Sequence, residues 1–145
     1  MRGVDAIGPE IGRLLALAHK QAARAFAEAL EPLDLDGRLF GVMTALARLG
    51  PMTQARLIVE LNSDKSTMLR TVDDLERRGL AERRPVPGDR RARTVALTPA
   101  GRARLTAGTE VAHRVAADLF GGMTTTEQTA LRDLLARFVH GGSGT

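Results

Sequence analysis

The sequence SDKSTMLRTVDDLERR occupies residues 63–78 and has the pattern of an amphipathic helix. At about 100° per residue, Met68, Val72 and Leu75 fall on one side of that helix. The opposite side is polar and consists of Ser66, Arg70, Asp73 and Arg77. Hydroxyl and guanidinium groups can hydrogen-bond base edges in the major groove, and the first turn of a helix offers N–H groups to phosphate. We predict that this stretch is a DNA recognition helix.

A helix-turn-helix that contains this stretch begins at Thr53. Thr53 is a suitable N-cap for a short helix that runs from Gln54 to about Leu61. Only the Asn62-Ser63 turn then separates it from the central helix, and two helices joined so closely form a helix-turn-helix. Gly79 ends the central helix, because glycine readily adopts the left-handed conformation found after many helices.

Residues at about 80–98 predict a β-hairpin beside the helix-turn-helix. Pro85 and Pro87 suit only an edge strand or a loop, because proline cannot donate to a central ladder. Val95 and Leu97 share one face of the return strand. We therefore expect a projecting ribbon, or wing, and not a central sheet. Its arginines are Arg83, Arg84, Arg90, Arg91 and Arg93.

Helical patterns flank this lobe on both sides. The first runs from about Glu10 to Leu30, with Pro32 beyond it, and a second follows the capping residue Asp36. Thr98-Pro99 starts a helix after the hairpin, and residues 124–127 spell a capping box for the last helix. We expect residues 141–145 to be a frayed tail and the four phenylalanines to be core residues; these are Phe26, Phe40, Phe120 and Phe138.

The fold class that follows is mainly α-helical with a small β-hairpin wing. We predict a single domain over residues 1–145, with a winged helix-turn-helix lobe at 36–98 and dimerisation helices at 10–31 and 99–140. The flanking helices have apolar faces, yet the lobe between them is nearly complete alone. A second copy of the chain is the simplest partner for those faces, and a homodimer would present two recognition helices about 34 Å apart.

Composition supports a double-stranded DNA partner. Residues 54–104 hold 12 basic and 7 acidic side chains, against 9 basic and 10 acidic elsewhere, so the positive charge is concentrated on the predicted lobe. Aromatic residues make up only 3% of the chain, which argues against binding single strands by base stacking. Such a localised charge would also fit a solvated, arginine-rich surface.

Several other classes of protein are disfavoured. The chain has no cysteine, no signal-peptide core and no apolar run of membrane-spanning length, so we expect a cytoplasmic protein without a thiol switch. His19, His113 and His140 are scattered, and no nucleophile–base pair or phosphate-binding glycine loop is evident. We expect no enzymatic activity, no cofactor and no metal site.

The motifs together resemble those of a known family. Residues 89–98 fit the spelling Asp, any residue, Arg, five residues, then Leu-Thr; residues 50–54, 64–67 and 75–80 match as well. The chain resembles the MarR family of transcriptional regulators over nearly its whole length. This resemblance implies a dimeric winged helix-turn-helix repressor on a pseudo-palindromic operator, released in many relatives by aromatic acids or phenols. The chain departs from the pattern at Leu69, often small and polar, and at Asn62, often glycine. Asparagine tolerates the left-handed conformation, so we expect the turn to survive.

Alternative roles are open for the recognition-helix residues. Arg70 could bind guanine O6/N7 or phosphate, or pair with a carboxylate on its own helix. Ser66 and Thr67 could contact DNA or only cap the first turn, and Leu69 could contact a thymine methyl group or pack on a sugar. Contacts to the phosphate backbone are expected from Thr53, Gln54 and Lys65, with helix capping as the alternative for the first two. Arg77 and Asp89 are further DNA-binding candidates.

In the wing, Arg90 or Arg91 could enter the minor groove, or Arg91 could pair with Asp89 and only stiffen the hairpin. Non-specific backbone contacts are expected from Arg83, Arg84 and Arg93. For a small-molecule effector, Arg13 and His19 are the only candidates we find, and a surface role is the alternative for both. A competing hypothesis for the whole chain is an architectural DNA binder with little sequence preference.

Overall fold

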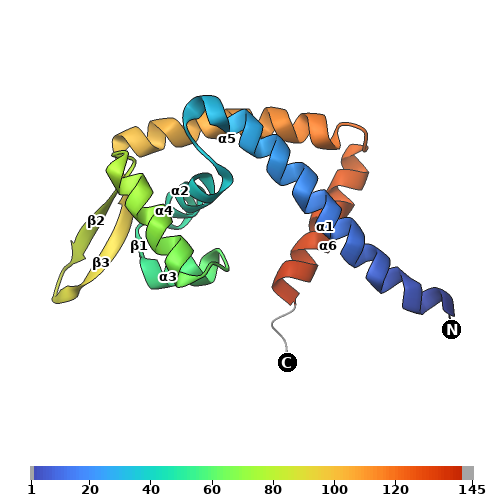
Figure 1. Cartoon of the computed structure of the whole chain (residues 1–145), viewed down its shortest axis with the longest axis horizontal. Coiled ribbons are helices and arrows are strands. Elements are labelled where there is room, and N and C mark those ends of the chain that lie inside the picture. Colours follow the sequence, from blue (N-terminus) through green and yellow to red (C-terminus); the bar gives the residue numbers. More distant parts are fainter. Residues whose placement is uncertain (1, 142–145) are drawn as a thin grey trace. The chain divides into compact units, whose positions relative to one another are not determined.

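The computed structural model describes residues 2–141 and divides the chain into two compact units, residues 1–112 and 113–145. The first unit contains α1 (Arg2–Leu30), a 3-10 turn (Glu31–Leu33), α2 (Gly37–Leu49), α3 (Gln54–Glu60), α4 (Lys65–Arg77) and a small sheet. Helix α5 (Pro99–Phe120) begins in the first unit, and α6 (Thr125–Gly141) belongs to the second (Figure 1). The predicted fold class, mainly helical with a small hairpin, is confirmed.

The hydrophobic core of the first unit lies between α2, α3, α4 and the base of the hairpin. Met68, Val72 and Leu75 of α4 are all at most 2% exposed, which confirms the predicted inward face of this helix. They belong to one cluster with Leu39, Val42, Met43 and Leu46 of α2 and with Leu57 of α3. The core thereby fixes which face of α4 is left for solvent.

The sheet has three strands, one more than the sequence predicted. Strand β1 (Met52–Thr53) pairs antiparallel with β3 (Asp89–Leu97), and β3 pairs with β2 (Ala81–Val86), in the order β1-β3-β2. The expectation of a ribbon without a central strand was therefore wrong at its base, where Val95 lies between both partners and is 1% exposed. A strand of two residues is too short to produce a periodic sequence signal. Beyond it, the hairpin projects as expected, with Pro85 on the outer strand (Figure 1).

Helix α1 begins earlier than predicted, at Arg2 and not near Glu10, with Pro9 inside it. Proline removes one main-chain donor and crowds the preceding turn. The apolar spacing nevertheless continues across it through Ile7, Ile11 and Leu14, which are each at least half exposed. The other predicted end of this helix is confirmed, since α1 stops at Leu30 and Pro32 lies in the 3-10 turn.

Local capping signals are confirmed wherever the sequence predicted them in this unit. The Asp36 carboxylate accepts a hydrogen bond from Leu39 N at 2.8 Å, and Thr53 Oγ1 accepts one from Arg56 N at 3.2 Å. Gly79 has a φ of 73° after α4, and Asn62 has a φ of 48° in the turn. The departure from glycine at position 62 thus leaves the left-handed turn intact.

Thr98 joins the hairpin to both neighbouring helices. Its hydroxyl donates to Gly79 O at 2.6 Å and accepts from Gly101 N at 3.0 Å, so it caps α5 and holds the end of α4. The backbones approach closely here. A Cβ on Gly101 would lie 1.9 Å from Leu80 O, well inside van der Waals contact with a main-chain atom.

We therefore expect Gly101→Ala to lower the free energy of unfolding by about 2 kcal/mol, as overpacking against a backbone that must shift usually does. Urea unfolding followed by circular dichroism measures it. Gly122→Ala is the matched control, because nothing lies within 4 Å of a Cβ there. Equal stability of both variants would contradict the close approach.

The second unit contains the end of α5, the Gly121-Gly122 break and α6. The capping box is confirmed: Thr124 N donates to Glu127 Oε1 at 2.9 Å, and Glu127 N donates to Thr124 Oγ1 at 3.2 Å. These bonds hold the pKa of Glu127 below its usual value. Phe138 is 67% exposed, so the expectation that it is a core residue was wrong for the single chain. Of the expected frayed tail, residues 142–145 lie outside the described residues, and Gly141 ends α6.

Between residues 2 and 141, none of the helices combines the length and the apolar character that crossing a lipid bilayer requires.

Candidate nucleic-acid interface

The first turn of α4 is organised by Asp64. Its carboxylate accepts hydrogen bonds from Thr67 N and Thr67 Oγ1, each at 2.7 Å, and these bonds hold the pKa of Asp64 below its usual value. The capping alternative is thus realised for the hydroxyl of Thr67. Lys65 and Ser66 are exposed beside it, and neither side chain has a hydrogen-bond partner within residues 2–141.

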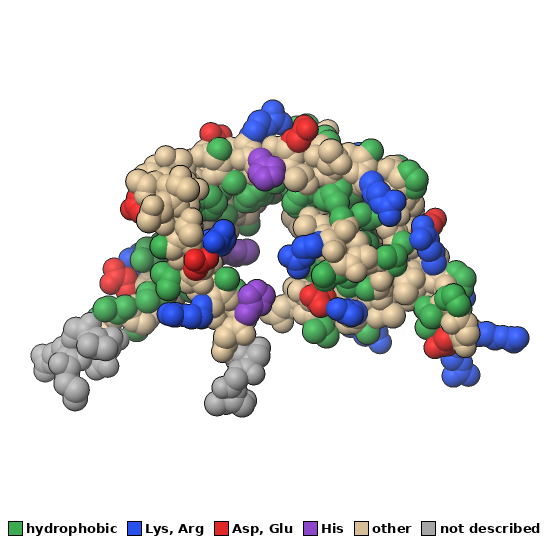
Figure 2. Space-filling view, turned by 180° about the vertical axis from the view of Figure 1, so that it is seen from behind, with side chains coloured by type: hydrophobic (Ala, Val, Ile, Leu, Met, Phe, Trp, Pro, Cys, Tyr) green, Lys and Arg blue, Asp and Glu red, His purple; other side chains and the backbone are tan. Residues whose placement is uncertain are grey.

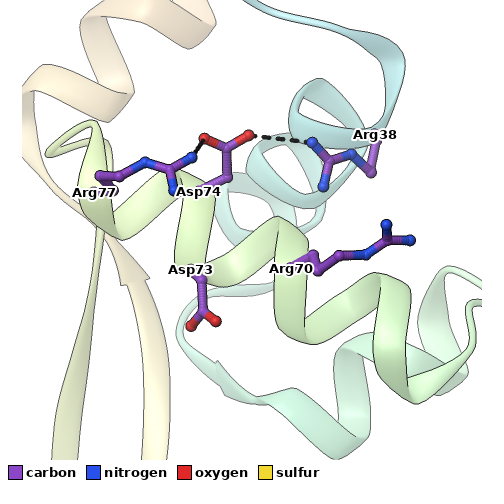
Figure 3. Close-up of a pocket in the computed structure, with 5 residues that line it drawn as sticks. All are labelled: Arg38, Arg70, Asp73, Asp74 and Arg77. Carbon is purple, nitrogen blue, oxygen red and sulfur yellow. Dashed lines mark hydrogen bonds and ion pairs between the residues drawn. The ribbon is translucent and has the colours of Figure 1, made fainter.

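Arg70 lies on the outer face of α4, one turn further on. It lines a pocket of about 410 Å³ together with Arg38, Asp73, Asp74 and Arg77 (Figure 3). In the described part of the chain it forms no ion pair, and the three carboxylates of its own helix, Asp73, Asp74 and Glu76, are all bound by other arginines. The alternative that Arg70 pairs within its helix is therefore not realised. Leu69 beside it is 45% exposed.

Asp74 is the centre of an arginine cluster that the sequence reasoning missed. Its carboxylate is 2.7 Å from Arg77 Nη2, 2.9 Å from Arg78 Nε and 3.1 Å from Arg38 Nη2. The Asp74 side chain is only 12% exposed. The hydrogen bond from Arg78 is the main cause that holds the pKa of Asp74 below its usual value, against the opposing effect of burial.

This cluster connects α4 to the elements before it. Arg38 comes from α2 and also donates to Thr71 Oγ1 at 3.2 Å, and Figure 3 shows its side chain meeting Asp74 from the facing helix. Arg78 reaches in the other direction, to Asp34 Oδ2 at 2.8 Å. The spacing of Asp74 to Arg77 and Arg78 is a helical i,i+3 and i,i+4 signal that could have been found. Arg38, 36 residues away in sequence, has no such signal.

Arg83 and Arg84 leave opposite sides of β2 and have different partners. Arg83 binds Asp73 and Glu76 of α4 at 2.7 and 2.9 Å, and its side chain is 25% exposed. Within residues 2–141, Arg84 binds only Glu82 of its own strand, at 2.7 Å, and it is half exposed. The guanidinium of Arg83, expected at a phosphate, is thus engaged within the chain.

The wing tip is stiffened through its backbone. Asp89 Oδ1 accepts from Arg91 N at 3.0 Å and from Ala92 N at 3.3 Å, and Gly88 turns the chain with a φ of 83°. Arg93 donates to Arg90 O and Ala92 O, both at 3.1 Å. No side-chain ion pair joins Arg91 to Asp89 among the described residues, so basic side chains remain at the tip (Figure 2).

The other residues singled out in the sequence lie outside α4 and the wing. The Thr53 hydroxyl caps α3, and Gln54, in the first turn, is half-buried. Arg13 and His19 are both exposed on α1, so a single chain does not enclose either of them. His113 and His140 lie on α5 and α6.

Comparison with known proteins places this interface in context. A model of the MarR family matches residues 33–92. The HTH-type transcriptional repressor NicR of Pseudomonas putida is 31% identical over 130 residues, which cover 90% of this chain and 82% of NicR. The segment matched by the family model, residues 33–92, includes the helix-turn-helix and most of the wing.

Solved structures agree in fold over almost the whole chain. A variant of Escherichia coli MarR complexed with operator DNA has a TM-score of 0.82 at 28% identity, covering 89% of this chain and 93% of that one. Bordetella bronchiseptica BpsR, whose DNA binding is regulated by 6-hydroxynicotinic acid, has a TM-score of 0.82 at 27% identity, covering 90% and 98%. With its helix-turn-helix, three-stranded wing and similarity to NicR along nine-tenths of its length, the chain belongs to the MarR family of transcriptional regulators.

Proposed function

We propose that this chain is a homodimeric, sequence-specific transcriptional repressor that binds a pseudo-palindromic operator and releases it on binding a small aromatic acid or phenol. The observation that carries this proposal is the pairing of the arginines around α4. Arg38, Arg77, Arg78 and Arg83 are each held by carboxylates, whereas Arg70, on the outer face, has no such partner among the described residues. A free guanidinium on an otherwise fixed face is suited to reading a base edge.

The proposed division of contacts follows from these positions. Arg70 binds guanine O6 and N7 in the major groove, with Ser66 and Leu69 contacting neighbouring base edges or methyl groups. Lys65, beside the N-terminus of α4, binds phosphate. Arg90 or Arg91 enters the minor groove from the wing tip. Further contacts to the DNA backbone come from Thr53, Gln54, Thr67, Arg77, Arg84 and Arg93, and Asp89 shapes the wing tip that presents the arginines.

Exposed apolar residues on the flanking helices support the homodimer. On α1, Ile11 and Leu14 are 51% and 50% exposed, and on α6, Leu134 and Val139 are 56% and 64% exposed. Large apolar side chains clustered on a surface mark an interaction site. A two-fold partner would cover both helices with the same chain and would match a palindromic operator.

The experiment that tests this function is selection from random duplexes, followed by titration of the selected sequence against a scrambled duplex at two salt concentrations. A two-fold symmetric sequence preferred at least about a thousandfold supports the repressor. A steep salt dependence without a preferred sequence would instead indicate an architectural binder. Failure to bind any duplex at low salt would overturn the proposal.

The effector proposal rests on Arg13 and His19 of α1, whose side chains can bind a carboxylate or a phenol. We expect His19→Ala to raise the ligand concentration needed for half-release of operator by about tenfold, as the loss of one charged or polar anchor does. The first probe is 6-hydroxynicotinic acid, the compound that regulates BpsR, followed by a panel of aromatic acids. Fluorescence anisotropy of labelled operator measures the release.

The matched control is Lys20→Ala, because Lys20 is the neighbouring residue on the same helix and is also exposed. It should leave both operator affinity and ligand response unchanged. If His19→Ala responds to the releasing compound as the natural chain does, His19 is a surface residue and the effector binds elsewhere.

A further inference from the structure

The geometry points to Arg83 as a positioning residue, one that fixes the wing on the recognition helix and takes no direct part in binding phosphate. This inference rests on the proposed function, because the wing and α4 are there proposed to bind neighbouring grooves of one operator. It assigns Arg83 a different role from the other arginines of the hairpin.

The contacts of Arg83 form a latch between β2 and α4. Its Nη2 donates to Asp73 Oδ1 at 2.7 Å and its Nη1 donates to Glu76 Oε1 at 2.9 Å. The main-chain N–H of Arg83 also donates to Glu76 Oε2 at 3.2 Å. Asp73 and Glu76 lie one turn apart, so a single guanidinium joins two successive turns of α4 to the strand.

These contacts leave Arg83 little capacity for DNA. Both terminal nitrogens are bound to carboxylates, and the side chain is three-quarters buried. A phosphate could take these donors only if the two carboxylates released them. Those carboxylates would then face the polyanion without a counter-charge, which is unfavourable.

The contacts of Arg83 hold an edge strand of the sheet, β2, against α4. In the order β1-β3-β2, β3 is paired on both sides, whereas β2 is an edge strand paired only with β3, and its Arg83 lies opposite Val95. The ladder fixes the hairpin internally, but the direction in which it leaves α4 depends on contacts between β2 and that helix. Arg83 supplies two ion pairs and a main-chain hydrogen bond there.

Arg83 also neutralises a negative charge on the outer face of α4, that of Asp73. Asp73 lies on the same outer face as Arg70, and Figure 3 shows it on the opposite side of the helix from the Asp74–Arg38 contact. A bare carboxylate on that face would repel DNA phosphates. Arg83 neutralises it from within the chain and so leaves Arg70 to determine the charge that the operator meets.

The decisive experiment is a double-mutant cycle on operator binding. We expect Arg83→Ala to weaken operator binding about tenfold in the natural chain, but less than twofold when Asp73→Ala and Glu76→Ala are already present. Arg83→Lys can reach only one carboxylate, so its operator affinity should lie between those of the natural chain and Arg83→Ala. An equal loss in both backgrounds would mean that Arg83 binds DNA directly and would overturn the inference.

Arg84→Ala is the matched control, because it removes the same charge from the neighbouring position of β2 but has no partner on α4. Its loss of affinity should be the same with and without the Asp73→Ala and Glu76→Ala substitutions. Coupling as large for Arg84 as for Arg83 would show that the cycle reports only net charge, and the latch would be rejected.

A second measurement needs no DNA. Arg83→Ala should accelerate hydrogen exchange of the main-chain amides of residues 82–86 by about tenfold, because the outer strand loses its anchor, whereas Arg84→Ala should not. Unchanged exchange would reject the latch. If the natural chain selects no duplex, the proposed function fails, and this measurement still decides whether Arg83 holds the wing.

Discussion

Arg70→Ala is expected to weaken binding to the selected operator by about a hundredfold. A bidentate contact from arginine to guanine contributes roughly 1–3 kcal/mol of discrimination, and a two-fold operator contains two such contacts. The side chain forms no ion pair among the described residues, so its removal leaves no carboxylate of α4 without its partner. Alanine also favours helix, so α4 itself should persist. Titration of labelled operator by fluorescence anisotropy measures the loss.

The comparison with scrambled duplex distinguishes base reading from charge. Affinity for scrambled duplex should fall much less, since only a general electrostatic attraction is lost there. Arg24→Ala is a suitable control because it removes an exposed arginine of α1 that pairs with Glu28 of the same helix. Equal losses on operator and scrambled duplex would show that Arg70 binds phosphate.

Local features of this chain were predictable because their causes are local. The caps at Thr53, Thr98 and Thr124 depend on residues three positions away, and the predicted bonds are present. The buried face of α4 follows from helical periodicity alone. The family resemblance rests on the same kind of short motif, and the match over residues 33–92 together with the similarity to NicR confirms it.

Features that depend on distant partners were not predictable. The sequence predicted that Arg83 would contact DNA, because a basic hairpin gives no sign of which arginines face acidic residues of another element. Asp73 and Glu76, ten and seven residues earlier, bind it only because the chain reverses after Gly79. Strand β1 was missed for a related reason, since its pairing with β3 spans about forty residues.

Large apolar side chains of α6 are exposed in the single chain, so the packing of this helix is incomplete there. Phe138 was expected in a core because large aromatic residues usually contribute most by burial. In the described structure it is 67% exposed, and its neighbour Val139 is 64% exposed. The sequence can mark a residue as apolar, but it cannot say whether the surface that covers it belongs to the same chain. The homodimer proposed above would reconcile the two observations.

Asp74→Ala is expected to lower the free energy of unfolding of the first unit by about 3 kcal/mol at pH 7. Breaking a buried ion pair from one side typically costs about 3–5 kcal/mol, because the remaining charge is left without compensation. We expect the lower end of this range because the arginines left without Asp74 are partly solvated. Arg77 is 75% exposed, and Arg38 and Arg78 are each about one-third exposed. Urea denaturation followed by circular dichroism measures the change. Glu60→Ala, which breaks only a 3.6 Å surface pair with Arg56, should change it by less than about 0.5 kcal/mol.

The dependence of this effect on pH tests its electrostatic origin. The arginines hold the pKa of Asp74 below its ordinary value of 3.8, so the folded state binds the Asp74 proton more weakly than the unfolded state. The stabilisation is therefore fully present above pH 3.8 and is lost as the pH falls through the lower pKa of the folded state. The difference in stability between the natural chain and Asp74→Ala should narrow over that acidic range. A difference that stays constant there would mean that Asp74 acts through packing, and the arginine cluster would not be what joins α2 to the recognition helix.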